Sequence, residues 1–173
     1  RENYYENLVP KSYQTYSYEG DVIRSMLSFE DNIYFVHKYS YNSKGQIFKE
    51  EQFSDDKLDA TNTFEYNSDG NISKEIYSND RSTSYQYDKK KNPLYLLFSD
   101  SVLKTYGSLG SKNNIISDSD NYSYDYTYNS QGFPTEVIEK YDGVVESKTT
   151  YTYEWMQPRE KLILVLTEFL LQK

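Results

Sequence analysis

Aromatic residues alternate with polar ones at six places along the chain, and this alternation is the dominant pattern of the sequence. Each place, called an anchor below, reads aromatic-x-Tyr followed by an acid or an amide. Side chains alternate between the two faces of a β-strand, so both aromatics of an anchor lie on one face. The anchors are Tyr16-Ser17-Tyr18-Glu19, Tyr39-Ser40-Tyr41-Asn42, Phe64-Glu65-Tyr66-Asn67, Tyr85-Gln86-Tyr87-Asp88, Tyr126-Thr127-Tyr128-Asn129 and Tyr151-Thr152-Tyr153-Glu154.

The anchors recur at a nearly constant period. The steps between their second tyrosines are 23, 25, 21, 41 and 25 residues, and the long step corresponds to two periods with one degenerate copy. A fixed period in the range of roughly 20 to 50 residues is the sequence signature of a repeat architecture. We therefore expect one structural repeat for each anchor.

Turn residues follow the anchors. Three copies read Asn-Ser-x-Gly, in which Asn can close an Asx turn and Gly accepts positive φ, as in a type I turn with a G1 bulge. An outgoing strand is expected after each glycine, and then a second turn, which makes every repeat a hairpin. The outgoing strands are Gln46–Phe53, Asn71–Tyr77 and Phe133–Tyr141, and the second turns are Ser54-Asp55-Asp56-Lys57, Ser78-Asn79-Asp80-Arg81 and Asp142-Gly143.

These hairpins predict an all-β fold: an antiparallel meander of about ten to twelve strands that forms a twisted sheet or partial barrel. We expect one domain over residues 1–173, with hairpin repeats at 13–93 and 122–154.

The chain departs from the repeat between residues 94 and 121, which we interpret as an insertion that packs over one face or end of the sheet. Pro93 bars a central position in a strand ladder. An apolar run, Leu94–Phe98, follows it, and Ser101–Leu109 is expected to be a short helix or an irregular excursion. Asn114-Ile115-Ile116 resembles the start of a strand.

The C-terminal segment, residues 155–173, changes character, because aliphatic residues replace tyrosine after Pro158. Proline at a first helical position and apolar residues at 162, 163, 166, 169 and 170 favour a helix. Leu162, Leu164 and Leu166 also fit a strand. We favour a helix that caps an open end of the sheet, and the alternative is an element that docks to a partner.

Composition limits the partners. With 21 tyrosines and 8 phenylalanines, aromatic rings must supply much of the buried apolar area. The formal net charge of −8 repels a phosphate backbone, so we expect no nucleic-acid partner. The absence of cysteine excludes disulfides and thiolate metal sites. No stretch approaches the roughly 18 apolar residues of a membrane span. Residues 1–3 carry no features of an export signal, so any such signal was removed or lies outside this sequence.

The sequence offers few residues suited to catalysis or metal binding. His37 is the sole histidine, which argues against a zinc site, and it is expected as a surface or half-buried partner rather than a general base. The acidic groups Glu50-Glu51, Asp55-Asp56 and Asp118-x-Asp120 suggest calcium ligands or a glycosidase pair, but turn chemistry already explains them and EF-hand spacing is missing. Gly107-Ser108-Leu109-Gly110 lacks the lysine of a phosphate loop. We predict no catalytic residue, metal or cofactor.

Aromatic side chains are the remaining candidates for function. One face of the meander should present rows of tyrosines, which serve either as core or as an exposed platform for glycans or proteins, and we favour core. Trp155, the sole tryptophan, is expected to fill the join between sheet and tail rather than to stack on a sugar.

The repeat Tyr-x-Tyr-Asn/Asp-x-x-Gly resembles the YD repeat of Rhs-type proteins, and more closely the tyrosine-repeat putative lipoproteins of Bacteroidetes, of flavobacterial type. The most characteristic stretches are residues 85–93 and 126–134. The resemblance spans roughly residues 13–154. It implies export to the outer membrane or cell surface by a lipid anchor upstream of Arg1. Asp100-Ser101-Val102 also matches the O-glycosylation acceptor pattern of that phylum, although so short a match is more often a chance one.

These observations favour a non-enzymatic binding or scaffold protein of the cell envelope. It would serve as an accessory lipoprotein subunit of an outer-membrane complex, with a protein partner in the outer membrane or a surface glycan. One alternative is a glycan-binding module that uses exposed tyrosines. A second is an enzyme of unrecognised type, which requires a deep pocket with a perturbed carboxylate or His37. A third is an Rhs-like shell fragment.

Overall fold

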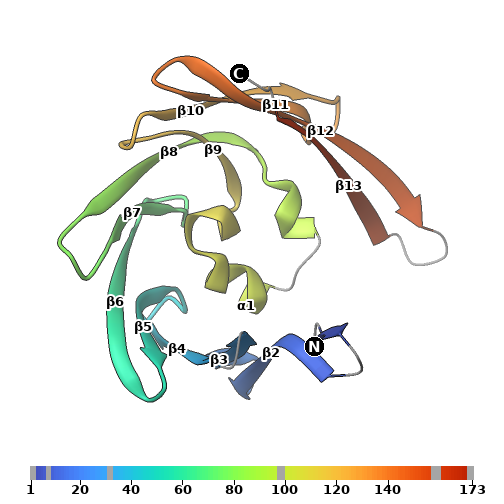
Figure 1. The fold of residues 1–173 in the computed structure, drawn as a ribbon. Helices are drawn as coiled ribbons and strands as arrows, with labels where there is room; N and C mark the ends of the chain where they lie inside the picture. The colour runs from blue at the N-terminus through green and yellow to red at the C-terminus, as the bar shows by residue number, and fades with distance from the viewer. Residues whose placement is uncertain (1–2, 7–8, 31–32, 97–99, 157–160, 171–173) are drawn as a thin grey trace. The chain divides into compact units, whose positions relative to one another are not determined.

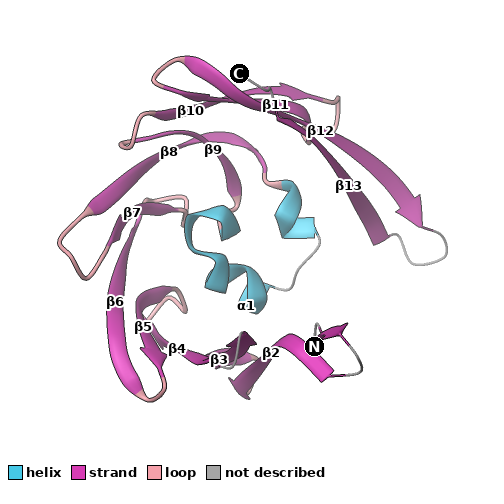
Figure 2. Cartoon of the chain, viewed as in Figure 1, coloured by secondary structure: helices cyan, strands magenta, loops and turns pink. Residues whose placement is uncertain are grey.

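The computed structural model describes residues 3–6, 9–30, 33–96, 100–156 and 161–170, with side chains over 13–29, 33–94 and 102–153. Within these ranges the chain forms thirteen strands and three short helical segments, the latter between β8 and β9 (Figures 1 and 2). The paired strands are antiparallel and consecutive in the chain, so the predicted all-β meander is confirmed. The residues divide into two compact units.

The first unit consists of residues 1–65 and 75–82. Each of its strands pairs with the next one along the chain. Its first two strands begin before residue 13, where we expected the repeats to start. The strands are β1 (Asn3–Glu6), β2 (Val9–Glu19), β3 (Val22–Glu30), β4 (Ile33–Tyr41), β5 (Ile47–Ser54) and β6 (Lys57–Tyr66).

The second unit consists of residues 66–74 and 83–173, and β7 (Ile72–Ile76) is divided between the two units. It is also a meander of sequential antiparallel pairs. The single domain expected over residues 1–173 stays a prediction. The strands are β8 (Ser82–Lys91), β9 (Asn113–Asp118), β10 (Tyr122–Tyr128), β11 (Pro134–Tyr141), β12 (Val144–Met156) and β13 (Lys161–Leu170).

The predicted hairpin tips are confirmed in detail. The side-chain oxygen of Asn129 accepts hydrogen bonds from the backbone N–H groups of Gln131 and Phe133, each at 3.0 Å. Asn42 and Asn67 make the same pair of bonds at their own turns. The fourth-position glycines have φ between 71° and 85°, a backbone conformation that glycine adopts without steric cost.

The residue two positions after each of these glycines is buried. Ile47 is 2 % exposed and Ile72 is 4 % exposed, and Pro134 belongs to the most deeply buried side chains. Ile23, three positions after Gly20, is fully buried. One apolar residue at the start of each outgoing strand therefore supplies a recurring core position.

The second tyrosine of three anchors fastens its hairpin to the preceding one. The hydroxyl of Tyr41 donates to the carbonyl oxygen of Ile23 at 2.6 Å, that of Tyr87 to Ile72 at 2.7 Å and that of Tyr153 to Pro134 at 2.6 Å. The acceptors are the buried residues just described. We call these hydrogen bonds the tyrosine ties.

Three short helical segments form the first part of the predicted insertion: η1 (Pro93–Leu96), α1 (Asp100–Leu103) and η2 (Lys104–Gly110). The short helix expected within Ser101–Leu109 is therefore confirmed. The side chain of Ser101, the residue that matches an acceptor pattern, lies outside the described side chains.

The strand start expected at Asn114-Ile115-Ile116 is also confirmed, because these residues belong to β9, which pairs with both β8 and β10. The non-repeat insertion is thus shorter than predicted. The turn after β9 copies the asparagine turns, since the Asp118 carboxylate accepts from the N–H groups of Asp120 and Tyr122. β9 with this turn is the degenerate copy inferred from the long step.

The helix favoured for the C-terminal segment is wrong. Residues 161–170 form β13, which pairs with β12 from Met156↔Lys161 to Ser147↔Leu170. The leucines at 162, 164 and 166 follow the two-residue period of a strand. An apolar run fits a helix and a strand equally well, and the ten residue pairs with β12 decide for the strand. The roles expected for the Trp155 side chain lie outside the described side chains.

Candidate functional site

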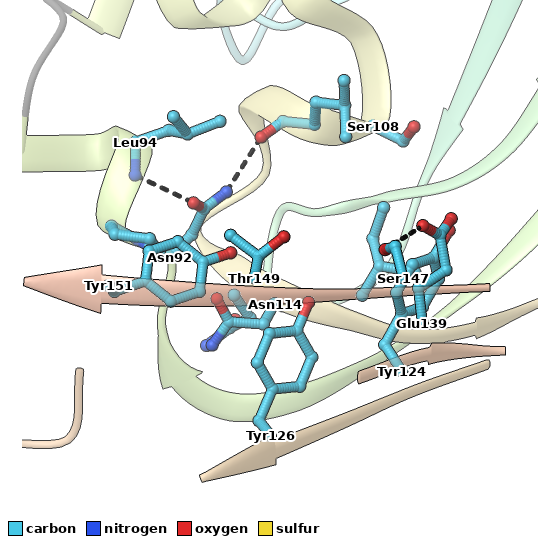
Figure 3. A pocket seen from close by; sticks show the side chains of 14 residues that line it. Asn92, Leu94, Ser108, Asn114, Tyr124, Tyr126, Glu139, Ser147, Thr149 and Tyr151 are labelled. Atoms are coloured by element: carbon cyan, nitrogen blue, oxygen red, sulfur yellow. Dashed lines mark hydrogen bonds between the residues drawn. The ribbon is translucent and has the colours of Figure 1, made fainter. Parts of the chain in front are cut away.

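A pocket of about 330 Å³ lies within the second unit, between the helical segments and the sheet (Figure 3). Its volume is at the lower end of the range of small-molecule sites. The sheet supplies tyrosine, hydroxyl and carboxylate side chains, and η1 and η2 supply mainly apolar ones. The lining residues used below are Asn92, Leu94, Asn114, Tyr124, Tyr126, Glu139, Ser147, Thr149 and Tyr151.

Strand register builds the sheet side of the pocket. Tyr124 on β10 faces Glu139 on β11, which faces Ser147 on β12. The next row on the same face of the strands contains Tyr126, Val137 and Thr149 in the same order. Tyr151 comes two residues after Thr149, so side-chain alternation places it on this face as well.

Three tyrosine hydroxyls reach the pocket in their neutral form. Burial raises the pKa of Tyr124 to about 12, and the negative charge of Glu139 adds to the effect. Burial also raises the pKa of Tyr126 and of Tyr151. A phenol with so high a pKa keeps its proton at neutral pH and donates a hydrogen bond.

None of these three hydroxyls, nor that of Thr149, has a hydrogen-bond partner that the structure describes. Figure 3 shows Tyr126 and Tyr151 pointing toward the middle of the pocket beside Thr149. Half-buried polar atoms in folded proteins normally have partners, so water or a ligand is expected to satisfy this group.

Among the described residues that line the pocket, Glu139 is the one with a charged side chain. The hydroxyl of Ser147, which is 6 % exposed, donates to its Oε2 atom at 2.9 Å. This hydrogen bond fixes the carboxylate on the sheet face, in the row that also holds Tyr124.

Asn92 links the start of the helical segments to their end. Its side-chain amide donates to the carbonyl oxygens of Leu109 and Ser111 at 2.8 and 2.7 Å, and its side-chain oxygen accepts from the N–H of Leu94 at 3.0 Å (Figure 3). The two ends of the segments are thereby held together above the sheet. Asn92 itself is buried, with 8 % of its surface exposed.

Asp88 holds Asn114, another residue that lines the pocket, in place. Its carboxylate accepts from both the backbone and the side-chain amide of Asn114, from the N–H of Lys90 and from the hydroxyl of Tyr128. Asp88 holds the position that asparagine occupies in three other repeats. Asp88 thus keeps a local bond from Lys90 and in addition bonds β9 and β10.

His37 is half-buried and has a side-chain partner, as expected from the sequence. It belongs to β4, and its Nδ1 lies 2.8 Å from the carboxylate of Glu50. The same carboxylate accepts from the side chains of Gln52 and Asn62. Burial alone would raise the pKa of Glu50, but the hydrogen bonds from His37, Gln52 and Asn62 outweigh it and lower the pKa. The cluster belongs to the first unit, apart from the pocket residues.

Two of the three acidic groups lie where turn chemistry predicted them, but Glu50-Glu51 lies inside strand β5, so turn chemistry does not explain it. Asp55 and Asp56 form the β5–β6 turn, with φ of 45° and 64°. Asp118 directs its turn as described above, and Glu51 pairs with Lys49. Within the described residues, no three His, Cys, Asp or Glu side chains gather in one place. Gly107-Ser108-Leu109-Gly110 lies in η2 rather than in a loop, and Gly107 breaks the helical geometry with φ of 59°.

The tyrosine face serves partly as core, as we expected. Tyr39 is 6 % exposed, and burial raises its pKa strongly. In the second unit the same kind of row lines the pocket instead. The alternation Tyr122-x-Tyr124-x-Tyr126 in the sequence carried this signal, but the cross-strand register that adds Glu139 and Ser147 did not follow from it.

Comparison with known proteins adds little. No family model matches the chain, and no curated protein matches it. Among solved structures, the chain is similar to "Crystal Structure of TcdB2-TccC3-TEV", with 14% identity and a TM-score of 0.30, and to the "Structure of Photorhabdus luminescens Tc holotoxin pore, Mutation TccC3-D651A", with 15% identity and a TM-score of 0.28. Each match covers 89% of this chain and 7% of the other chain. These TM-scores are too low to establish a shared fold or function.

No helix in the described ranges combines the length and the apolar character needed to cross a bilayer.

Proposed function

We propose that this chain is a non-enzymatic binding protein in which a rigid hairpin-repeat sheet holds one ligand pocket. The pocket in the second unit carries the proposal, because four of the side chains that line it bear hydroxyls without a partner among the described residues, beside one oriented carboxylate. Such a group of fixed polar atoms in a cavity of about 330 Å³ is typical of recognition of a small polar ligand.

The cell envelope is the proposed location. The tyrosine-repeat resemblance supports export and an upstream lipid anchor at the outer membrane or cell surface. In this setting the ligand is a surface glycan or part of one, and the repeat sheet is the scaffold that presents the pocket.

A second candidate function is docking to a protein partner as an accessory subunit. The tip of the β11–β12 hairpin favours it, because Tyr141, Val144 and Val145 are 42 %, 56 % and 37 % exposed there. Apolar side chains grouped on an exposed turn are typical of a contact surface. Val144→Asp should then release a partner that Val144→Thr retains.

The test of the pocket is retention of the native ligand. The tagged full-length protein is purified from its source membranes in mild detergent, with Thr149→Trp to fill the pocket and Thr152→Trp, on the exposed face of the same strand, as the matched control. Native mass spectrometry and glycan analysis should find a bound species on the wild type and the control but not on Thr149→Trp. A ligand that all three retain, or none on any, would overturn the pocket as the binding site.

A further inference from the structure

The inventory of hydrogen-bonding groups in the pocket indicates which chemical class it holds. We propose that the pocket binds one neutral sugar residue of hexose size through its hydroxyl groups, a step that rests on the binding function proposed above. The residues that carry it are Tyr124, Tyr126, Glu139, Thr149 and Tyr151.

Hydroxyl groups of a sugar match the free groups of the pocket. Each sugar hydroxyl both donates and accepts, and so do the phenols of Tyr124, Tyr126 and Tyr151 and the hydroxyl of Thr149. Phenols are protonated at neutral pH in any case, and burial raises the pKa of these three further, so all of them are donors. Several ligand oxygens can therefore be bound at once without any change in protonation.

Glu139 supplies the one strong acceptor. Ser147 already occupies its Oε2 atom, which leaves Oε1 without a protein partner in the described part of the chain. A hydrogen bond to a charged group is worth more than one between neutral groups. We infer that Oε1 accepts from a ligand hydroxyl and orients the sugar ring across the row that contains Tyr124.

Charge argues against acidic ligands. None of the lining residues whose side chains the structure describes is Lys, Arg or His, and Glu139 brings a negative charge. The whole chain adds a formal net charge of −8. A uronic acid or a sugar phosphate would therefore be repelled by the pocket and by the surrounding field.

An organic cation is the competing class, because aromatic rings and a carboxylate also recognise quaternary ammonium groups. Such a ligand would use ring faces and would leave the tyrosine and threonine hydroxyls without partners. Burying polar atoms without partners costs free energy, so the hydroxyl-rich lining favours the sugar.

The test uses saturation-transfer NMR and calorimetry on the full chain. The panel is glucose, galactose, mannose, fucose and N-acetylglucosamine, with glucuronate, glucose 6-phosphate and choline as the competing chemistries. A single neutral sugar is expected to bind with a Kd on the order of 1 mM, since small ligands gain limited free energy per atom. Glucuronate, glucose 6-phosphate and choline should bind at least about tenfold more weakly.

Variants assign the binding to the pocket. Glu139→Gln should weaken sugar binding about tenfold or more, and Tyr126→Phe or Tyr151→Phe roughly threefold to tenfold, since each removes one hydrogen bond. Tyr141→Phe and Glu136→Gln make the same chemical changes outside the pocket, and should leave the Kd unchanged. Thermal unfolding of every variant verifies that it is folded.

The outcomes distinguish failure of the sugar proposal from failure of the proposed binding pocket. Preferential binding of choline or of an acidic sugar, or neutral-sugar binding that Glu139→Gln and Tyr126→Phe leave intact, would overturn the sugar proposal. If no neutral sugar binds while Thr149→Trp still removes a native ligand, the sugar class is wrong and the binding pocket stands. If neither sugar nor native ligand depends on the pocket, both proposals fall.

Discussion

The hydroxyl of Tyr41 donates a hydrogen bond to the carbonyl oxygen of Ile23, 2.6 Å away and 18 residues earlier in the chain. The acceptor belongs to Ile23, a fully buried residue of the first unit. Tyr87 and Tyr153 make the same kind of bond to Ile72 and Pro134. In these three repeats the hydroxyl of the tyrosine thus has a structural role in addition to that of its ring.

Loss of a tyrosine tie should destabilise the protein. Tyr41→Phe keeps the ring but leaves the carbonyl oxygen of Ile23 buried without its donor, which should cost about 1 to 3 kcal/mol in the free energy of unfolding. Urea denaturation followed by circular dichroism measures the change. Tyr18→Phe, at a tyrosine that is 54 % exposed, is the matched control and should stay within about 0.5 kcal/mol of the wild type. Equal stability of the two variants would show that the tie contributes nothing.

The asparagine at a hairpin tip should be replaceable only by another acceptor. Asn129→Ala removes the oxygen that accepts from Gln131 and Phe133, and we expect a loss of about 1 kcal/mol. Asn129→Asp retains the acceptor, as Asp118 does at the turn after β9, and should recover most of this loss. Chemical denaturation of the three proteins tests the order of stability, and an alanine variant as stable as the aspartate variant would contradict it.

The turn between β5 and β6 should accept glycine with a gain in stability. Asp55 and Asp56 both have positive φ, whereas the β11–β12 turn combines Asp142 with Gly143. Asp56→Gly removes the cost of a left-handed conformation at a non-glycine residue, about 1 kcal/mol. The greater backbone entropy of glycine in the unfolded state costs about 0.5 kcal/mol, so the free energy of unfolding should rise by roughly 0.5 kcal/mol. Thermal unfolding should show a higher Tm for Asp56→Gly and a lower one for Asp56→Ala. The reverse order would mean that the aspartate side chain, not the backbone, determines this turn.

The Glu50 cluster should give stability a dependence on pH. Its hydrogen bonds lower the pKa of Glu50 in the folded state relative to an unfolded value of about 4.3. The stability that it contributes is therefore fully present above the unfolded pKa and is lost as the pH falls through the folded pKa. Urea midpoints measured from pH 6 to pH 3 should fall less steeply for Glu50→Gln than for the wild type.

Glu51→Gln is the control for this pH dependence, since Glu51 lies beside Glu50 and pairs with Lys49 on the same strand. It should retain the slope of the wild type. Two variants with the same slope would remove Glu50 as its origin.

Local patterns in the sequence determined the hairpins well because each depends on a few adjacent residues. Asn67 and Gly70 close their turn through bonds within five residues, so the turn could be predicted without knowing the rest of the fold. Residues 161–170 differ, because their apolar run fits both a helix and a strand. Pairing with β12, the strand just before it in the chain, decided the outcome, and an apolar run by itself does not show whether it will pair with a neighbouring strand.

The pocket was not predicted for the same reason. The alternating tyrosines of β10 indicated an aromatic face, but Glu139 and Ser147 join Tyr124 only through the register of three strands. A shift of one residue in either pairing would move these side chains to the other face. The helical segments that cover the row were expected over one face or end of the sheet, without any indication of which side chains they would cover.

The bond between Asp88 and Tyr128 has a consequence for how such a chain can change over evolutionary time. It joins the anchor before the helical segments to the anchor two repeats later, across 40 residues, while Asn92 clasps the ends of the segments themselves. The same carboxylate also accepts from Asn114 on β9, so one side chain bonds both β9 and β10. A substitution at Asp88 would remove all of these bonds at once, which makes this position costlier to change than a residue that serves its own turn alone.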